Sequence, residues 1–215
     1  MSFVPLDEKA GDDAEAKALV AAYDERVAAM NLTAAKKLPE SCAAPDKGEA
    51  AFIGVSAKAG SVEGCASCHA TEAKFWAKTE HAHAYATLVK VNKHLSLDCI
   101  QCHVTGWQQP GGVCRIDRTQ VGGGGVALAG TARGGVGRQD VQCEACHGAG
   151  SEHAADPPGH IEAKVGRSAC MRCHEAANSP HFSYEKYLPA VVGPGHGQAL
   201  AKGQEPGPKS ARASP

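Results

Sequence analysis

The pattern of hydrophobic and polar positions along the chain predicts two helices. Residues 12–31 (DDAEAKALVAAYDERVAAMN) have the mixture of charged and apolar positions typical of a charged amphipathic helix. Residues 71–91 contain neither glycine nor proline and are predicted to form a second helix. On that helix His81, Tyr85 and Leu88 would share one face at positions i, i+4 and i+7. Patterns typical of strands are nearly absent.

Glycine and proline punctuate much of the remaining chain. Residues 36–64 are predicted to be loop, and residues 105–138 form a long glycine-rich insert with little capacity to build a core. The sequence therefore predicts an N-terminal helix and linker over residues 1–63 and a central domain over residues 64–197. The tail over residues 198–215 is expected to be disordered.

The composition indicates that side chains alone do not fill this central domain. Aromatic residues make up 5 % of the chain, and alanine, which buries little area, supplies much of its 43 % hydrophobic fraction. Such a chain needs disulfides, metals or a bulky cofactor in its interior. The net charge of −1 gives no indication of a nucleic-acid partner or an anionic membrane surface. No apolar run approaches the length of a membrane span.

Eight of the ten cysteines form four CxxC pairs, and histidine follows each pair directly. The motifs are Cys65-Ala-Ser-Cys68-His69, Cys99-Ile-Gln-Cys102-His103, Cys143-Glu-Ala-Cys146-His147 and Cys170-Met-Arg-Cys173-His174. CxxCH is the attachment signature of c-type haem, because two thiols one helical turn apart reach both vinyl groups of one porphyrin. The adjacent histidine then binds the iron. Zinc ribbons, redox dithiols and structural disulfides also use paired cysteines, but none requires the histidine.

The four predicted haem attachment motifs indicate the fold class. Four haem c groups, each with its iron, would form the core of the domain. Short helices and loops would wrap them, which predicts a mainly α multihaem cytochrome c fold with much irregular loop and little or no β-sheet. Asp98 and Glu144 flank motif cysteines and are expected to be solvated.

The second axial ligand of each iron is expected to be histidine. Methionine is nearly excluded, because the chain has only Met1, Met30 and Met171, the last inside a motif. Seven histidines lie outside the motifs: His81, His83, His94, His153, His160, His181 and His196. His81 is the best placed of them on the predicted helix. His83 points away from the His81 face of that helix and is expected to face solvent slightly more readily than a haem. His160 is expected in an exposed loop. His94 could either bind a haem iron or face solvent.

The motif region resembles the cytochrome c-554 family of tetrahaem cytochromes. The matching stretches are CASCHATEAKFWAKTEHAHAY, CIQCHVTGWQQPGG, VQCEACHGAGSEH and FSYEKYLPAVVGPGH, which together cover most of residues 64–196. The N-terminal helix and the glycines of residues 120–137 have no counterpart in this family. The resemblance implies a mainly helical wrap around closely stacked haem pairs.

The same resemblance implies ligand pairs that cross between motifs. His81 would lie opposite His147, and His153 opposite His69. His196 would lie opposite His174, with His181 as its rival. The second haem, on His103, is five-coordinate in the family pattern, although His94 or His83 are candidates to fill that position here.

These residues predict transfer of electrons between redox partner proteins, with no catalytic residue assigned. One alternative is an enzyme that converts a small nitrogen species at an open haem, and another is a self-associating subunit of a conducting assembly. Haem attachment to CxxCH takes place outside the cytoplasm, which predicts a periplasmic or cell-surface protein. No leader is visible, so the chain is expected to be leaderless, to have a misassigned start or to be the haem module of something larger. An exported protein would permit a disulfide between Cys42 and Cys114, but the sequence leaves their pairing open.

Overall fold

Most of the regular secondary structure in the described residues is helical. The computed structural model describes residues 11–37, 42, 46–55, 64–110, 112–121, 125–129, 138–157, 159–162, 164–193 and 196. The α-helices are α1 (Ala14–Ala35), α2 (Ala70–Trp76), α3 (Ala84–Lys90), α4 (Leu97–His103), α5 (Cys143–His147), α6 (Ser151–Ala155), α7 (Arg167–Met171) and α8 (Tyr184–Val192). Two 3₁₀ turns, η1 (Cys65–Ser67) and η2 (Glu80–His83), complete the helical elements, and the predicted mainly α class with much irregular loop is confirmed.

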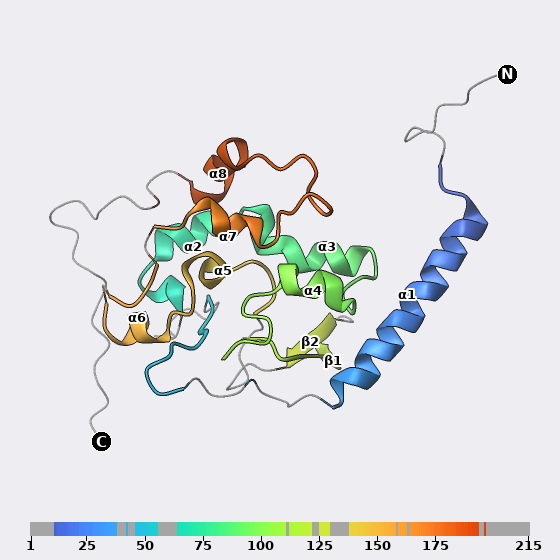
Figure 1. Ribbon diagram of the computed structural model, residues 1–215, viewed down its shortest axis with the longest axis horizontal. Helices are drawn as coiled ribbons and strands as arrows, with labels where there is room; N and C mark the ends of the chain where they lie inside the picture. The colour runs from blue at the N-terminus through green and yellow to red at the C-terminus, as the bar shows by residue number, and fades with distance from the viewer. Residues whose placement is uncertain are drawn as a thin grey trace.

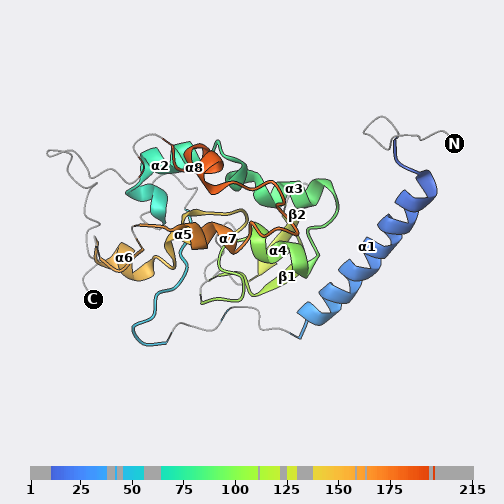
Figure 2. The ribbon, with the colours of Figure 1, turned by 45° about the horizontal axis from the view of Figure 1, so that its top comes forward.

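Helix α1 confirms the predicted N-terminal helix and extends it to Ala35. Asp13 caps its start by accepting the Ala16 backbone N–H at 2.8 Å. Figures 1 and 2 show the N-terminal part of this helix projecting from the body, which the helix contacts from Asp24 towards its C-terminal end. There the Asn31 side-chain amide donates to the Leu95 carbonyl at 2.8 Å.

The single helix predicted over residues 71–91 is wrong, because the structure divides this stretch into α2, η2 and α3. The break follows Trp76, where both the backbone N–H and the hydroxyl of Thr79 donate to the Trp76 carbonyl. A second cause is tertiary: the Val141 N–H donates to the His81 carbonyl at 3.0 Å, and the Trp76 indole donates to the Val141 carbonyl at 2.8 Å. The chain around Val141 therefore competes with helical hydrogen bonding here.

A two-stranded hairpin occupies part of the glycine-rich insert. Strands β1 (Arg115–Val121) and β2 (Gly125–Ala129) pair antiparallel with Arg115 opposite Ala129 and Val121 opposite Gly125, and the register is irregular between Ile116 and Gln120. Neither strand was predicted from the sequence, in which strand patterns are nearly absent. Residues 122–124 and 130–137 of the insert, most of the linker at residues 38–63, and the tail at residues 198–215 lie outside the described residues.

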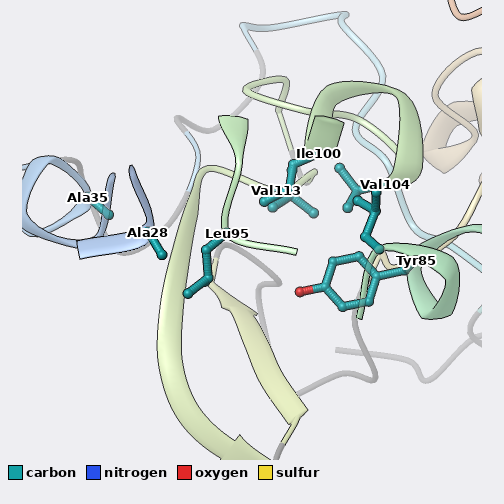
Figure 3. Packing of buried hydrophobic residues seen from close by; sticks show 8 residues of the cluster. Ala28, Ala35, Tyr85, Leu95, Ile100, Val104 and Val113 are labelled. Carbon is teal, nitrogen blue, oxygen red and sulfur yellow. The ribbon is translucent and has the colours of Figure 1, made fainter. Parts of the chain in front are cut away.

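The apolar core gathers at the end of the body that meets α1. Figure 3 shows side chains from α1, α3 and α4 packed together with Leu95, Val104 and Val113. Ile100 and Val113 are completely buried. Among the described residues, α5, α6, α7 and α8 add no buried hydrophobic side chain to this cluster. The region of the third and fourth motifs therefore lacks an apolar core of its own.

A disulfide joins Cys42 to Cys114, with their Cα atoms 5.2 Å apart. The sequence left this pairing open. Cys114 is buried directly before β1, so the bond anchors the linker that follows α1 to the start of the hairpin.

Replacing both cysteines, Cys42→Ser with Cys114→Ser, is expected to lower the free energy of unfolding by about 2–4 kcal/mol, because 72 positions separate the bonded residues and the bond restricts a long loop of the unfolded chain. Denaturant unfolding followed by circular dichroism measures the change. Each single replacement should lower the free energy of unfolding by about as much as the double replacement, since either one removes the same disulfide. Small, additive losses from the two single variants would contradict the pairing.

Candidate haem-binding centre

Each cysteine–histidine motif lies on a short helical turn. The first occupies η1 and ends at His69, the residue directly before α2; the second ends α4, the third is α5 itself, and the fourth runs from α7 into the following turn. In the first motif the His69 N–H donates to the Cys65 carbonyl, and in the fourth the His174 N–H donates to the Cys170 carbonyl, both at 2.9 Å. This turn places both thiols and the following imidazole on one side of the backbone, as the spacing predicts.

Three of the motif histidines face a second histidine from outside the motifs. The ring centroids of His69 and His153 are 6.1 Å apart, with an interplanar angle of 25°. Those of His81 and His174 are 6.1 Å apart at 41°, and those of His147 and His196 are 5.9 Å apart at 30°. Two metal–nitrogen bonds of about 2 Å, the length usual for imidazole ligands, place opposed ring centres about 6 Å apart. The residues therefore fit a haem iron between the two rings of each pair.

Hydrogen bonds on the other ring nitrogen orient several of these imidazoles. Nδ1 lies 2.8 Å from the Glu162 carbonyl oxygen in His147 and 2.9 Å from the Gly159 carbonyl oxygen in His153. In His103 it lies 2.6 Å from the carbonyl oxygen of Ala84. A carbonyl oxygen only accepts, so Nδ1 carries the proton and Nε2 keeps the lone pair that a metal needs.

Two contacts position His174, the histidine of the fourth motif. Its Nδ1 lies 3.1 Å from the Ser179 hydroxyl, and the Phe182 ring stacks on it with centroids 4.2 Å apart and an interplanar angle of 11°. Burial lowers the pKa of His81, His174 and His196. All three rings are therefore favoured in the neutral form in which imidazole binds metals.

The observed pairs correct part of the expected arrangement. His69 faces His153, in agreement with the expected pair. His81, however, faces His174 rather than His147, and His196 faces His147 rather than His174. Helix α8 packs on α2, and Gly193 at its end lies so close to Phe75 that an added Cβ would be 2.6 Å from the ring.

The other histidines have different surroundings. His83 is exposed, as expected, and lies near the Asp140 carboxylate. His160 is also exposed, with Nε2 3.8 Å from Asp156, and His181 is exposed and forms none of the three facing pairs. His94 is half-buried, and the Tyr85 hydroxyl lies 3.5 Å from its carbonyl oxygen. Within the described residues, His103 is the motif histidine that no second histidine ring faces.

Cysteines of different motifs lie next to one another. The Cys65 and Cys143 thiols lie close enough to shift each other's pKa, which places the first motif next to the third. The Cys102 thiol lies close enough to Cys173 to raise the pKa of Cys173, which places the fourth motif next to the second. The third and fourth motifs also pack together, through α5 and α7. The four motifs therefore form one continuous cluster.

The sequence reasoning missed a buried carboxylate in this cluster. Glu144 was expected to be solvated, but it is 2 % exposed and accepts backbone N–H groups from two other segments of the chain. The matching expectation for Asp98 is confirmed, since this residue is exposed at the start of α4. The sequence of the third motif alone does not distinguish the two acids, because two of the three N–H donors to Glu144, those of Ile53 and Gly54, lie 91 and 90 positions away.

The motifs and their geometry define the chain as a c-type cytochrome. Residues 64–148 match the family model of cytochrome c554 and c-prime, and this region belongs to that family. The matched region contains the first three motifs, whereas the fourth lies beyond it. No curated protein and no solved structure matches the chain at a significant level. None of the helices in the described residues is long and apolar enough to cross a membrane.

Proposed function

We propose that this protein is a tetrahaem cytochrome that transfers electrons between redox partner proteins. The observation that carries the proposal is the three facing imidazole pairs, each spaced for one iron atom and each including a motif histidine. When bound, the haems supply iron that alternates between two oxidation states. The chain contributes the thiols that attach them, the imidazoles that hold the iron and the hydrogen bonds that orient these imidazoles.

The contacts between motifs support transfer through the protein. The proximity of Cys65 to Cys143 and of Cys102 to Cys173 brings attachment points of separate haems together. Haems attached at adjacent cysteines lie close to one another, so an electron entering at one haem can continue to the next.

The ligand set supports low reduction potentials. Axial methionine raises the potential of a haem, and every iron ligand that we assign here is a histidine. The ligands are His69 with His153, His174 with His81, His147 with His196, and His103 on the second haem.

The disulfide supports an oxidising location. Disulfides persist in the periplasm and at the cell surface, where c-type haem is also attached. The pairing of Cys42 with Cys114 therefore favours export of the mature protein, with partner proteins that meet it there.

A second candidate function follows from the second haem. His103 lacks a facing histidine ring among the residues that the structure describes. An open coordination position is what distinguishes catalytic metal centres from closed ones. The haem on His103 is therefore a candidate site for binding and converting a small nitrogen species such as nitric oxide.

The haem number is tested by intact mass spectrometry together with a pyridine haemochrome assay. We expect four covalently attached haems per chain, because each CxxCH motif attaches one. The variant Cys170→Ala with Cys173→Ala should carry three and serves as the control for the motif outside the matched family region. A matured protein with zinc in place of iron, or with fewer than four haems, would overturn the proposal.

The exchanged ligand pairs are tested by replacing His81 with alanine. Loss of this imidazole should convert the haem attached at Cys170 and Cys173 to a high-spin form, visible in the ferric electron paramagnetic resonance spectrum. In the three-haem background without these two cysteines, the same replacement should add no high-spin signal. Replacing the exposed His160 is the matched control and should change nothing.

If His81 instead faces His147, as the family resemblance implies, the variants will give the opposite result. In that case the new high-spin signal would persist without the haem at Cys170 and Cys173. It would disappear instead in a Cys143→Ala, Cys146→Ala background.

The open position on the second haem predicts one high-spin ferric haem among the four in the unmodified protein. Added nitric oxide should shift the spectrum of that haem alone, because the other three irons have both axial positions filled. Cys99→Ala with Cys102→Ala should abolish the response. A wholly low-spin spectrum that is inert to nitric oxide would exclude the enzyme and leave the electron carrier.

A further inference from the structure

A buried charge lies where the first and third haem motifs meet. The Glu144 carboxylate accepts the backbone N–H groups of Ile53 at 2.8 Å, Gly54 at 2.6 Å and Gly150 at 2.8 Å. Three donors around one acid are the arrangement that stabilises its ionised form, because an ionised carboxylate only accepts hydrogen bonds. Burial raises the pKa of Glu144, and these three N–H groups oppose that rise.

A positive charge accompanies this acid. The Arg138 guanidinium donates to the Phe52 carbonyl at 2.7 Å, so it is anchored to the same short segment, residues 52–54, that binds Glu144. An added Cβ at Gly54 would collide with this guanidinium, which shows how closely the arginine approaches the segment. Burial lowers the pKa of Arg138, whereas the charge of Glu144 raises it. The two groups therefore form an electrostatic pair of opposite sign.

Glu144 is connected to both adjacent haem attachment sites. It directly follows Cys143, a thioether cysteine of the third motif. Gly54, which donates to Glu144, also accepts the Cys65 N–H of the first motif at 3.2 Å. The charge of Glu144 acts on the Cys65 and Cys143 sulfurs, which lie close to each other. The Glu144 carboxylate therefore lies near two haem attachment sites. The charge of the exposed Asp98, which precedes Cys99, is screened by water.

We propose that Glu144 and Arg138 are residues that tune the reduction potentials of the first and third haems, with opposite signs. This inference rests on the proposed function, because it requires a haem at each of those motifs. Reduction adds one electron to a haem, and a nearby buried carboxylate disfavours that added negative charge. A nearby guanidinium favours it. Both effects are stronger than at the surface, because water screens buried charges less.

The test is a spectroelectrochemical titration of the full haem-loaded protein. Glu144→Gln removes the negative charge and leaves Arg138 without its opposing charge, so two of the four one-electron potentials should rise. Arg138→Gln should lower the same two potentials. Asp98→Asn is the matched control, an exposed acid next to a motif cysteine, and should leave all four potentials unchanged.

Charge-conserving variants distinguish tuning from a structural role. Glu144→Asp and Arg138→Lys disturb the same hydrogen bonds but keep each charge, so their potentials should stay close to those of the unmodified protein. If Glu144 and Arg138 act only as structural supports, the two glutamine variants will lose stability without opposite shifts in potential. That outcome would overturn the inference.

A haem count on every protein separates this inference from the proposed function. Four haems with unshifted potentials in both glutamine variants would overturn the tuning role and leave the tetrahaem carrier intact. Fewer than four haems in the unmodified protein would overturn the carrier itself. If Glu144→Gln fails to mature, Arg138→Gln decides the question alone: lowered potentials support the inference and unchanged potentials contradict it.

Discussion

The arrangement of this molecule depends on opposed imidazoles separated by the width of one coordinated metal atom. His69 and His153 lie far apart in the sequence but face one another with ring centroids 6.1 Å apart, a spacing suited to an iron between them. The pairs of His81 with His174 and of His147 with His196 have nearly the same spacing. Iron ligation in these pairs would cross-link segments that otherwise share few apolar contacts.

The position of the apolar core agrees with a structure that depends on iron ligation by the imidazole pairs. Buried apolar side chains such as Ile100 and Val113 gather near α1, α3 and α4, at one end of the body. Around the third motif the chain instead relies on hydrogen bonds from residues 51–55 to Glu144, Gln142 and Ser151. Such a network fixes the backbone around a cofactor, but it buries little hydrophobic area, and apolar burial is the main favourable contribution to folding. Porphyrin rings would supply the missing apolar surface there.

The sequence predicted the features that depend on neighbouring residues. The CxxCH spacing identified the attachment turns, and local patterning predicted α1 and the mainly helical class. The break after Trp76 could not be predicted, because hydrogen bonds to and from Val141 contribute to it. The burial of Glu144 and the partners of His81 and His196 likewise depend on contacts between distant segments. In the glycine-rich insert, β-branched Ile116, Thr119 and Val121 before the run of glycines were a hairpin signal that the glycine content obscured.

The central claim is that haem, rather than side-chain packing, completes the interior. Its most direct test compares far-ultraviolet circular dichroism and thermal unfolding of the haem-loaded protein with those of a chain whose eight motif cysteines are alanine. The account predicts that the haem-free chain loses most of its helical signal and unfolds without a cooperative transition. A haem-free chain with the same helical spectrum and a cooperative transition would contradict it.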